Sequence, residues 1–409
     1  MQNKYFRKGF GLKNEVVESI EKEFNSLIVD YMKSVDNGIA AGNTTIKLAK
    51  EFGFCYGVDR SVEYAYQTLK RFPGKKIYLT GEIIHNPFVN KRLVDRGVYF
   101  LTGSHNRGEK FDDIGSEDVV ILPAFGVSVQ LLEDLKKKDC ILVDTTCGSV
   151  LVVWKHVEKF SREGFTAVVH GKYYHEETIA TVSRTTLGGT GKYIVVKDIP
   201  ETQKVCAYIR NPQNKEEFLK NFEKAVSPGF DPEQDLVKIG VANQTTMLAS
   251  ESLQVGQLVQ AALIGRYGKA QIDNHFRAFD TICSATQERQ DAVKELLASK
   301  PDLTLVIGGF NSSNTRSLCS LASGYGPAFH VEGEADILND REIKNQPVGT
   351  TNTVLSKNWL PPGKITIAIT AGASTPNARI GAVISKLFQI RHENLDFEKI
   401  TKPEPTPSI

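Results

Sequence analysis

The sequence ILVDTTCGSVLVVWKHV at residues 141–157 combines an apolar run, a turn that contains one cysteine and an amphipathic stretch. Residues 141–146 predict a short buried strand, and residues 151–164 carry apolar side chains at helical spacing. A strand that is apolar throughout is typical of a parallel sheet with helices on its faces. The segment therefore predicts an α/β fold in which Cys147 lies between a strand and a helix.

The same alternation of strand-like and helix-like segments recurs along most of the chain. Further amphipathic, helix-like stretches follow residues 126 and 286. The strand-like runs are KIYLTG (76–81), VVILPAFG (119–126), ILVDTT (141–146), TAVVHG (166–171), LTLVIGG (303–309) and ITIAITAG (365–372). Because loops at the carboxyl ends of such strands collect ligand-binding groups, the residues after these runs are candidates for a functional site.

Two other segments repeat the arrangement around Cys147. GFCYGVDRSVEYAY (53–66) and DTICSATQERQDAV (280–293) each place one cysteine in a short turn before a helix-like stretch. We therefore predict three similar α/β units, each with one thiol at the start of a helix. The helix dipole and its free N–H groups lower the pKa of such a thiol and favour the thiolate that binds metal.

The composition is that of an ordinary globular protein of 409 residues, with 41% hydrophobic and 24% charged residues. The net charge of +2 gives no overall attraction to nucleic acid or membrane surfaces, so we expect neither as a partner. We find no apolar run long enough for a membrane span and no apolar signal core at the acidic N-terminal region. We expect a cytoplasmic protein, or one of the plastid stroma if the chain is a mature form.

The six cysteines are too widely spaced for a small zinc ribbon, and a chain of this length without a secretion signal does not suggest a disulfide framework. Three of them, Cys55, Cys147 and Cys283, occupy the repeated turns. Three thiolates leave one iron of a four-iron cluster without a protein ligand, and such an iron can act as a Lewis acid on a substrate oxygen. Spacing alone also allows three independent buried cysteines, or a catalytic zinc held by three thiolates and water.

Polar loops after several of the strand-like runs indicate an anionic ligand. NSSN (311–314) and AGASTPNARI (371–380) each lead into a helix-like stretch and offer more donors than one helix cap needs. A helix N-terminus with such donors is a suitable phosphate site. Histidines in EIIHNP (82–87) and HGKYYHEET (170–178) can add donors, and the threonines of NQTT (243–246) can cap a helix or bind a substrate oxygen.

Together these motifs resemble the LytB family, the hydroxymethylbutenyl diphosphate reductases that catalyse the last step of the methylerythritol phosphate route to isoprenoids. The matching segments cover most of residues 45–385 in family order: GFCYGVDRSV, EIIHNPFVN, DTTCGSV, HEET, NQTT, DTICSATQERQDAV, GGFNSSNTRSL and ITAGASTP. The resemblance implies a trefoil of three α/β units with small, mostly parallel sheets around a central [4Fe-4S] cluster. It also implies reductive dehydroxylation of (E)-4-hydroxy-3-methylbut-2-enyl diphosphate to isopentenyl diphosphate and dimethylallyl diphosphate.

The resemblance implies a role for each matching side chain. It makes Cys55, Cys147 and Cys283 the cluster ligands. Glu177 matches the proton donor, and Thr245 matches the hydroxyl that organises the proton relay and contacts the substrate. The positions that match diphosphate ligands are His85, His175, Ser312, Ser313, Asn314 and Ser374.

One loop departs from the family pattern. Many members carry a histidine, as AHG, where this chain reads PAFG with Phe125. A phenyl ring cannot hydrogen-bond a diphosphate, so that contact is either lost or supplied by another group. This loop, the N-terminal extension and the long segment 179–240 are similar to the branch found in photosynthetic lineages, which implies reduced ferredoxin, or flavodoxin, as electron donor.

Along the chain we expect an N-terminal extension with one surface helix, three α/β units and a disordered tail. Their boundaries are 1–44 for the extension, 45–146, 147–279 and 280–397 for the units, and 398–409 for the tail. Segment 179–240 carries no motif that assigns it a role. We expect Cys140 and Cys206 in strand-like runs and Cys319 in a helix, all three as buried small hydrophobic residues.

Two other functions stay open on the residues alone. One is a non-redox hydro-lyase that uses an open iron in the same way, and the other is a metal-binding scaffold without turnover. The motifs NSSN, AGAST, HEET and NQTT favour an enzyme, because a purely structural metal needs no such groups around it.

Overall fold

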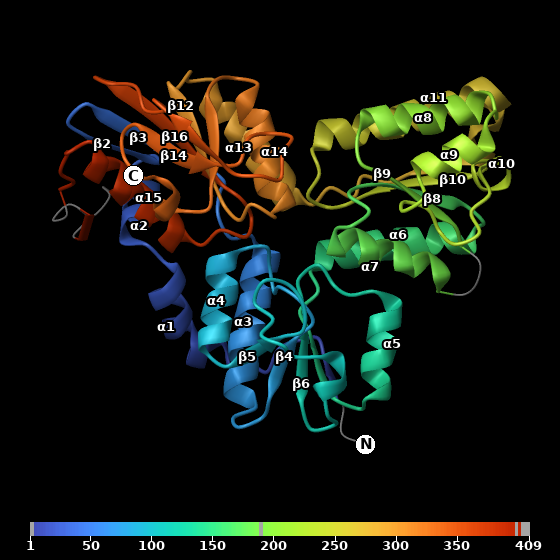
Figure 1. The fold of residues 1–409 in the computed structure, drawn as a ribbon, viewed down its shortest axis with the longest axis horizontal. Helices are drawn as coiled ribbons and strands as arrows, with labels where there is room; N and C mark the ends of the chain where they lie inside the picture. Colours follow the sequence, from blue (N-terminus) through green and yellow to red (C-terminus); the bar gives the residue numbers. More distant parts are fainter. Residues whose placement is uncertain (1–3, 188–190, 397–399, 402–409) are drawn as a thin grey trace, which may run out of the picture. The chain divides into compact units, whose positions relative to one another are not determined.

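The computed structural model describes residues 4–187, 191–396 and 400–401. These residues form two compact units, each with its own hydrophobic core. The first unit comprises Met1–Arg7, Tyr78–Thr80 and Glu109–Cys283, and the second comprises Lys8–Ile77, Gly81–Gly108 and Ser284–Ile409. Both combine parallel strands with packed helices, so the predicted α/β class with small, mostly parallel sheets is confirmed (Figure 1). The trefoil and the boundaries of three α/β units stay predictions.

The first unit is built on short parallel strands. In one sheet β1 (Tyr5–Phe6), β7 (Ile141–Asp144) and β6 (Val119–Leu122) run parallel in that order, with β4 (Ile77–Leu79) next to β6. In the other sheet β11 (Phe276–Ala278), β10 (Ile239–Asn243), β8 (Thr166–His170) and β9 (Tyr193–Val196) are all parallel. The loops that hold several predicted site residues leave the carboxyl ends of β7, β8 and β10, as expected for an α/β sheet.

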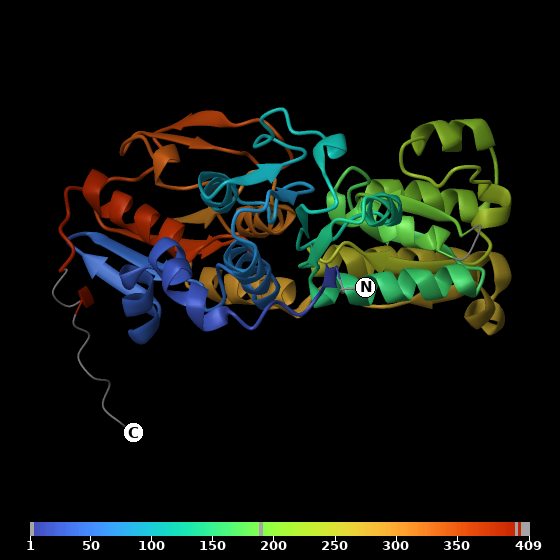
Figure 2. The same cartoon turned by 90° about the horizontal axis from the view of Figure 1, so that it is seen from below.

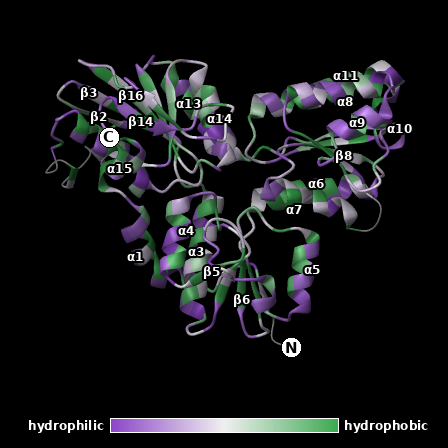
Figure 3. Ribbon diagram, in the orientation of Figure 1, coloured by the Kyte–Doolittle hydropathy of each residue, from purple (hydrophilic) through white to green (hydrophobic). Residues whose placement is uncertain are grey.

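Helices cover both faces of the sheet that contains β8 and β10. Helices α6 and α7 lie on one face, and α8 and α11 lie on the other (Figure 1). The helices of this unit are α5 (Val129–Lys137), α6 (Gly148–Arg162), α7 (Glu176–Ser183), α8 (Ile199–Arg210), α9 (Lys215–Asn221), α10 (Pro232–Asp235), α11 (Ala249–Tyr267) and α12 (Ile272–His275). Figure 3 shows both hydrophilic and hydrophobic stretches on α5, the pattern of a helix with one face on a protein core.

The second unit has a five-stranded sheet in the order β13 (Ala328–Val331), β12 (Leu303–Ile307), β16 (Ile365–Ala371), β3 (Thr44–Leu48) and β2 (Gly38–Ala41). All neighbouring strands in it are parallel except the hairpin of β2 and β3. A separate antiparallel pair is formed by β14 (Glu342–Asn345) and β15 (Val354–Lys357). Figure 2 shows the red helix α15 between this orange pair and the blue strands β2 and β3.

The remaining strand of the second unit is β5 (Val98–Phe100). Its helices are α1 (Lys13–Phe24), α2 (Leu27–Ser34), α3 (Tyr56–Arg71), α4 (Pro87–Asp95), α13 (Ser284–Leu297), α14 (Ser313–Ser323) and α15 (Asn377–Ile390). Fully buried Ile46, Leu305 and Ile367 come from three adjacent strands and pack under Ile384 of α15 in one core. None of the helices that the described residues form has the length and apolar character of a membrane span.

All six predicted strands and the helices behind them are present, because their apolar periodicity is unambiguous. The prediction of a single N-terminal helix was wrong. The chain forms two helices, α1 and α2, because the backbone at Asn25 between them is extended, with ψ of 167°. The unassigned segment 179–240 supplies β9 and α8 to the first unit's core. The predicted disordered tail lies almost entirely outside the described residues.

The prediction that Cys206 lies in a strand-like run was also wrong. Cys206 is in α8, whose start is set by the Asp198 side chain, which accepts a hydrogen bond from Glu201 N at 2.9 Å, and by Pro200 in the first turn. These are strong helix-start signals, and they outweigh the short apolar run around the cysteine. Cys140 lies directly before β7, and Cys319 is in α14 as expected.

The contact between β10 and α6 gives a test of the first unit's packing. A Cβ at Gly240 would lie 2.4 Å from Cγ of Phe160, a side chain that is fully buried. We expect Gly240→Ala to lower the free energy of unfolding by roughly 1–3 kcal/mol, the usual cost of overpacking a core. Thermal and urea unfolding of the purified variant measure this.

Gly265→Ala is the matched control, since Gly265 is an exposed position of α11 with no atom within 4 Å of an added Cβ. This change should leave stability unchanged or raise it by about 0.5–1 kcal/mol through helix propensity. Equal stability of the two variants would contradict the packing described for Gly240.

Candidate active site

Each of the three predicted cluster cysteines lies at the start of a helix. Cys55 is the N-cap of α3, Cys147 is the N-cap of α6, and Cys283 directly precedes α13. Their backbone N–H groups donate to carbonyl oxygens of other segments, Cys55 to Ala373 at 3.1 Å and Cys147 to Ala124 at 2.7 Å. All three are partly exposed. The sequence-based placement at helix N-termini is therefore confirmed.

The other three cysteines have a different environment. Cys140, Cys206 and Cys319 are each at most 3% exposed. Burial raises the pKa of Cys206 and of Cys319 to about 11, and burial also raises the pKa of Cys140. A thiol that resists deprotonation is a poor metal ligand, so these three behave as small hydrophobic residues.

The loop that carries Cys147 is fixed by Asp144 at the end of β7. Asp144 accepts hydrogen bonds from the backbone N of Thr146 at 3.0 Å, the hydroxyl of Tyr5 at 2.7 Å and Nε of Arg7 at 2.9 Å. Burial alone would raise the pKa of Asp144, but these hydrogen bonds and the charge of Arg7 outweigh it and hold the pKa below its ordinary value. Asp144 lies in the DTTC motif, but its role could not be predicted, because Tyr5 and Arg7 lie more than 130 residues away in the sequence.

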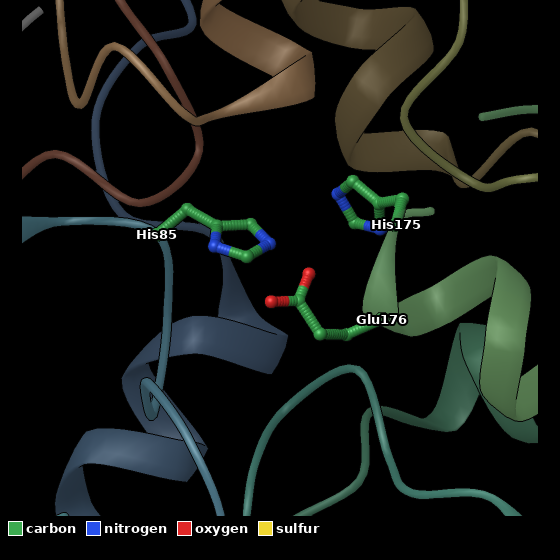
Figure 4. A group of neighbouring side chains, drawn as sticks. All are labelled: His85, His175 and Glu176. Atoms are coloured by element: carbon green, nitrogen blue, oxygen red, sulfur yellow. The ribbon is translucent and has the colours of Figure 1, made fainter. Parts of the chain in front are cut away.

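Helix α7 presents the acidic candidates. His175 is its N-cap, and Nδ1 of His175 accepts a hydrogen bond from Glu177 N at 3.2 Å. Figure 4 shows His175 and Glu176 at consecutive positions where α7 begins. Glu176 is exposed, whereas Glu177 is only 2% exposed. Both glutamates are in the first turn of α7, where successive side chains point about 100° apart.

Glu177 is held by the NQTT loop. Its Oε1 accepts a hydrogen bond from the backbone N of Thr245 at 2.6 Å, and both residues are buried. Thr245 does not cap the following helix, because α11 begins only at Ala249 with Leu248 as N-cap. The predicted pair of Glu177 and Thr245 is thus in direct contact, through the backbone of Thr245.

Gln244 joins the same two loops and was missed from the sequence. Its Oε1 accepts from Lys172 N and from the Thr178 hydroxyl, both at 3.2 Å, and its Nε2 donates to Thr246 at 2.9 Å. Gln244 is 1% exposed, and every polar atom of its amide group is engaged. A buried amide with this many bonds fixes the position of α7 relative to β10.

In the second unit, NSSN opens α14 as predicted. Ser312 is the N-cap and accepts a hydrogen bond from Thr315 N at 3.3 Å. Asn314 Oδ1 accepts from Ala373 N at 2.9 Å, which ties NSSN to the AGAST loop. The hydroxyl of Ser313 is buried and has no hydrogen-bond partner within the described part of the chain. A buried hydroxyl at a helix N-terminus without a protein partner suits a bound anion.

His85 belongs to the same unit. Its Nδ1 lies 3.0 Å from Oε2 of Glu82, and Glu82 Oε2 also accepts from Asn311 Nδ2 at 2.7 Å. The hydroxyl of Ser374 donates to the carbonyl oxygen of His85 at 3.1 Å. Glu82, which sequence reasoning passed over, therefore orients the imidazole and connects EIIHNP to NSSN, as a carboxylate orients a ligand histidine at many sites.

The approach of these loops depends on Gly309. A Cβ there would lie 2.6 Å from the carbonyl oxygen of His85, so only glycine permits the contact. The AGAST loop leads into α15, whose N-cap is Pro376.

Phe125 offers no replacement for the missing histidine. It is 8% exposed, and its ring centroid lies 6.3 Å from that of His175 with the planes at 72°. The ring therefore packs edge-on against His175 and contributes no donor.

The two units divide the predicted site residues between them. The first unit carries Cys147, Cys283, His175, Glu177 and Thr245, and the second carries Cys55, His85, Ser312, Ser313, Asn314 and Ser374. Within each unit the predicted loops contact one another through the hydrogen bonds described above. Within the second unit, the buried hydroxyls of the NSSN and AGAST loops suit an anionic ligand.

Comparison with known proteins identifies relatives over nearly the whole chain. The sequence model of the LytB protein family matches residues 46–388. A protein of Gloeobacter violaceus named 4-hydroxy-3-methylbut-2-enyl diphosphate reductase is 44% identical over 396 residues, which cover 96% of this chain and 94% of the relative. A protein of Crocosphaera subtropica with the same name is 45% identical over 388 residues, 95% of each chain.

A solved structure has a similar fold. The E-1-hydroxy-2-methyl-but-2-enyl-4-diphosphate reductase from Plasmodium falciparum aligns with a TM-score of 0.61 and 24% identity, over 84% of this chain and 87% of that one. The family match and the two relatives together extend well beyond the motifs. The chain belongs to the LytB protein family.

Proposed function

We propose that this chain is a 4-hydroxy-3-methylbut-2-enyl diphosphate reductase and acts in the last step of the methylerythritol phosphate pathway. The observation that carries the proposal is the identity of 44–45% to relatives of that name over nearly their full length. The reaction consumes the allylic alcohol, two electrons and two protons, and releases water with isopentenyl or dimethylallyl diphosphate. If the chain were a hydro-lyase or a structural scaffold, its similarity to these reductases would have no explanation.

The cofactor of this reaction is a [4Fe-4S] cluster with Cys55, Cys147 and Cys283 as ligands. These three cysteines alone combine partial exposure with a helix start, whereas Cys206 and Cys319 are buried thiols with a raised pKa. Three thiolates leave one iron without a protein ligand. When bound, the cluster would supply the electrons and a Lewis-acidic iron that makes the substrate hydroxyl a better leaving group.

Glu177 delivers the proton that allows the hydroxyl oxygen to leave as water. Its Oε1 accepts a hydrogen bond from Thr245 N at 2.6 Å, which fixes the position of the carboxyl group. Because Glu177 is buried, solvent does not compete for this proton. The Thr245 hydroxyl, which the same backbone contact fixes, passes protons between Glu177 and the substrate.

Each unit offers its own donors for the diphosphate. In the first unit the donor is the imidazole of His175, whose Nδ1 accepts a hydrogen bond from Glu177 N. In the second unit the donors are the hydroxyl of Ser313, the N-terminal N–H groups of α14 and the side chains of His85, Ser312, Asn314 and Ser374. Phe125 takes no part in this binding.

Reduced ferredoxin, or flavodoxin, is the electron donor, because the two electrons enter one at a time and the similar relatives come from photosynthetic organisms. The enzyme then works in the compartment that holds this carrier, which we expect to be the cytoplasm.

The direct test is anaerobic turnover of 4-hydroxy-3-methylbut-2-enyl diphosphate with reduced methyl viologen. We expect a brown protein that forms isopentenyl and dimethylallyl diphosphate and consumes reductant in proportion to the product formed. Turnover without any reductant would instead identify a hydro-lyase, and a colourless zinc protein without turnover would identify a scaffold; either result contradicts the proposal.

The cysteine assignment predicts that Cys147→Ser loses most of its iron and its activity, because a hydroxyl is a much poorer ligand for iron than a thiolate. Cys319→Ser is the control and should keep both, with only a modest loss of stability from burying a hydroxyl. Iron and sulfide analysis of anaerobically purified variants measures the difference. Full iron content in Cys147→Ser would remove that residue from the ligand set; the same comparison applies to Cys55 and Cys283.

The proton-donor assignment predicts that Glu177→Gln binds substrate but turns over slowly. The amide keeps the shape but lacks an acidic proton, so kcat should fall by roughly 10²–10⁴-fold, the usual contribution of a general acid. Glu176→Gln, at the exposed neighbouring position, should retain kcat within about twofold. If Glu176→Gln lowers kcat and Glu177→Gln does not, the exposed carboxylate of Glu176 is the proton donor.

The phosphate site predicts that Ser313→Ala weakens the binding of pyrophosphate and of substrate by roughly 10–150-fold, because a charge-assisted hydrogen bond contributes about 1.5–3 kcal/mol. Folding should be unaffected, since the hydroxyl has no partner among the described residues. Ser323→Ala, at the exposed end of the same helix, is the control. Anaerobic calorimetry measures both, and unchanged pyrophosphate affinity in Ser313→Ala would show that this helix N-terminus does not bind phosphate.

A further inference from the structure

The segment that ends at the proposed cluster ligand Cys283 runs beside strand β10 in the first unit. Strand β11 pairs with β10 in parallel. Where β11 ends, Phe279 N donates a hydrogen bond to the carbonyl oxygen of Val241 at 3.3 Å. Further along, Cys283 N donates to the carbonyl oxygen of Thr245, also at 3.3 Å. Residues 276–283 are therefore attached both to β10 and to the NQTT loop that follows it.

The contact between these two backbone bonds is made by the side chain of Thr281. Its hydroxyl accepts a hydrogen bond from Asn243 N at 2.7 Å and donates one to the carbonyl oxygen of Asn243 at 3.2 Å. A single hydroxyl can do this because it is both a donor and an acceptor. Thr281 is 5% exposed and Asn243 is 4% exposed, so the pair lies away from solvent. Thr281 thus takes the place of a backbone partner for the last residue of β10.

Thr245 connects this segment to the proposed proton donor. Its N–H donates to Oε1 of Glu177 at 2.6 Å, and its carbonyl oxygen accepts from Cys283 N. The backbone of one residue therefore contacts both the proposed acid and a proposed cluster ligand. A shift of the chain at Thr281 would move Thr245 with it or break the bond between Thr245 and Cys283.

We propose that Thr281 is a positioning residue for the reaction. Its hydroxyl holds the segment of Cys283 against β10 and thereby fixes the place of this ligand relative to Glu177. The proposal rests on the proposed function and adds to it a residue that acts through Cys283 and Thr245. Groups that orient the ligands of a metal typically contribute about 10–100-fold to metal affinity or activity.

A hydroxyl that only satisfies the end of a strand would affect stability and nothing else. The chain offers a matched control for that role. Thr202 in α8 is fully buried, and its hydroxyl donates to the carbonyl oxygen of Asp198 at 2.9 Å. Helix α8 belongs to the same unit and carries none of the proposed site residues.

The test compares Thr281→Val with Thr202→Val as anaerobically purified holoenzymes, since valine is branched like threonine but has no hydroxyl. In Thr281→Val, iron release to EDTA should be roughly 10–100-fold faster and kcat with reduced methyl viologen roughly 10–100-fold lower. Thr202→Val should stay within about twofold of the unsubstituted protein in both measurements. Thr281→Ser keeps the hydroxyl and should restore both to within about threefold.

Two further measurements separate a positioning role from general damage. The affinity of Thr281→Val for pyrophosphate should stay within about threefold of that of the unsubstituted protein, so that the loss appears in kcat and not in binding. The EPR spectrum of the reduced cluster should change in Thr281→Val and return in Thr281→Ser. Thr202→Val should lose thermal stability to a similar extent but keep the original spectrum.

Equal iron release and equal kcat in the two valine variants would overturn the role of Thr281. A loss that Thr281→Ser does not restore, or one matched by an equal loss of pyrophosphate affinity, would also overturn it. If Thr281→Val does not fold, Thr281→Ala takes its place, and failure of both to fold would show that Thr281 acts on folding alone. Absence of a cluster or of viologen turnover in the unsubstituted protein contradicts the proposed function itself, which the comparison of the valine variants does not.

Discussion

Everything proposed for the site depends on three helices, α3, α6 and α13, that begin at or directly after a cysteine. The start of a helix exposes backbone N–H groups that have no partner within the helix, and these favour a thiolate. In each case the N–H of the cysteine is itself held by a carbonyl of another segment, Ala373, Ala124 or Thr245. The position of each thiol is therefore set by tertiary contacts, and the loops that make those contacts are the ones that carry the polar candidates.

The parts of this arrangement that are local in sequence could be predicted. Apolar runs predicted the strands, and amphipathic periodicity predicted the helices that follow them in sequence. The cysteines, NSSN and HEET were placed correctly because each lies within a few residues of a strand end or helix start. Local signals failed where two of them competed. The apolar run around Cys206 predicted a strand, but the helix N-cap at Asp198 outweighs it. The periodicity of the N-terminal region predicted one helix, but the extended backbone at Asn25 divides it into two.

The residues that hold the site together could not be predicted, because their partners are distant in sequence. Asp144 is fixed by Tyr5 and Arg7, Glu82 by Asn311, and Gln244 by Lys172 and Thr178. Each of these side chains orients a loop and is not itself a proposed ligand. A single sequence contains no local pattern for such a contact. The structure also gives Asn314 a second role, since its carbonyl oxygen accepts from Ala373 N at 2.9 Å and its amide nitrogen donates to the Thr286 hydroxyl at 3.5 Å.

The central claim is that three cysteines hold a four-iron cluster with one iron open to substrate. Mössbauer spectroscopy of anaerobic, 57Fe-labelled protein tests it most directly, because each iron reports its own coordination. We predict a spectrum in which three irons show tetrahedral coordination by sulfur, while the fourth differs and changes when 4-hydroxy-3-methylbut-2-enyl diphosphate is added. Four equivalent irons that do not respond to the substrate would contradict the claim.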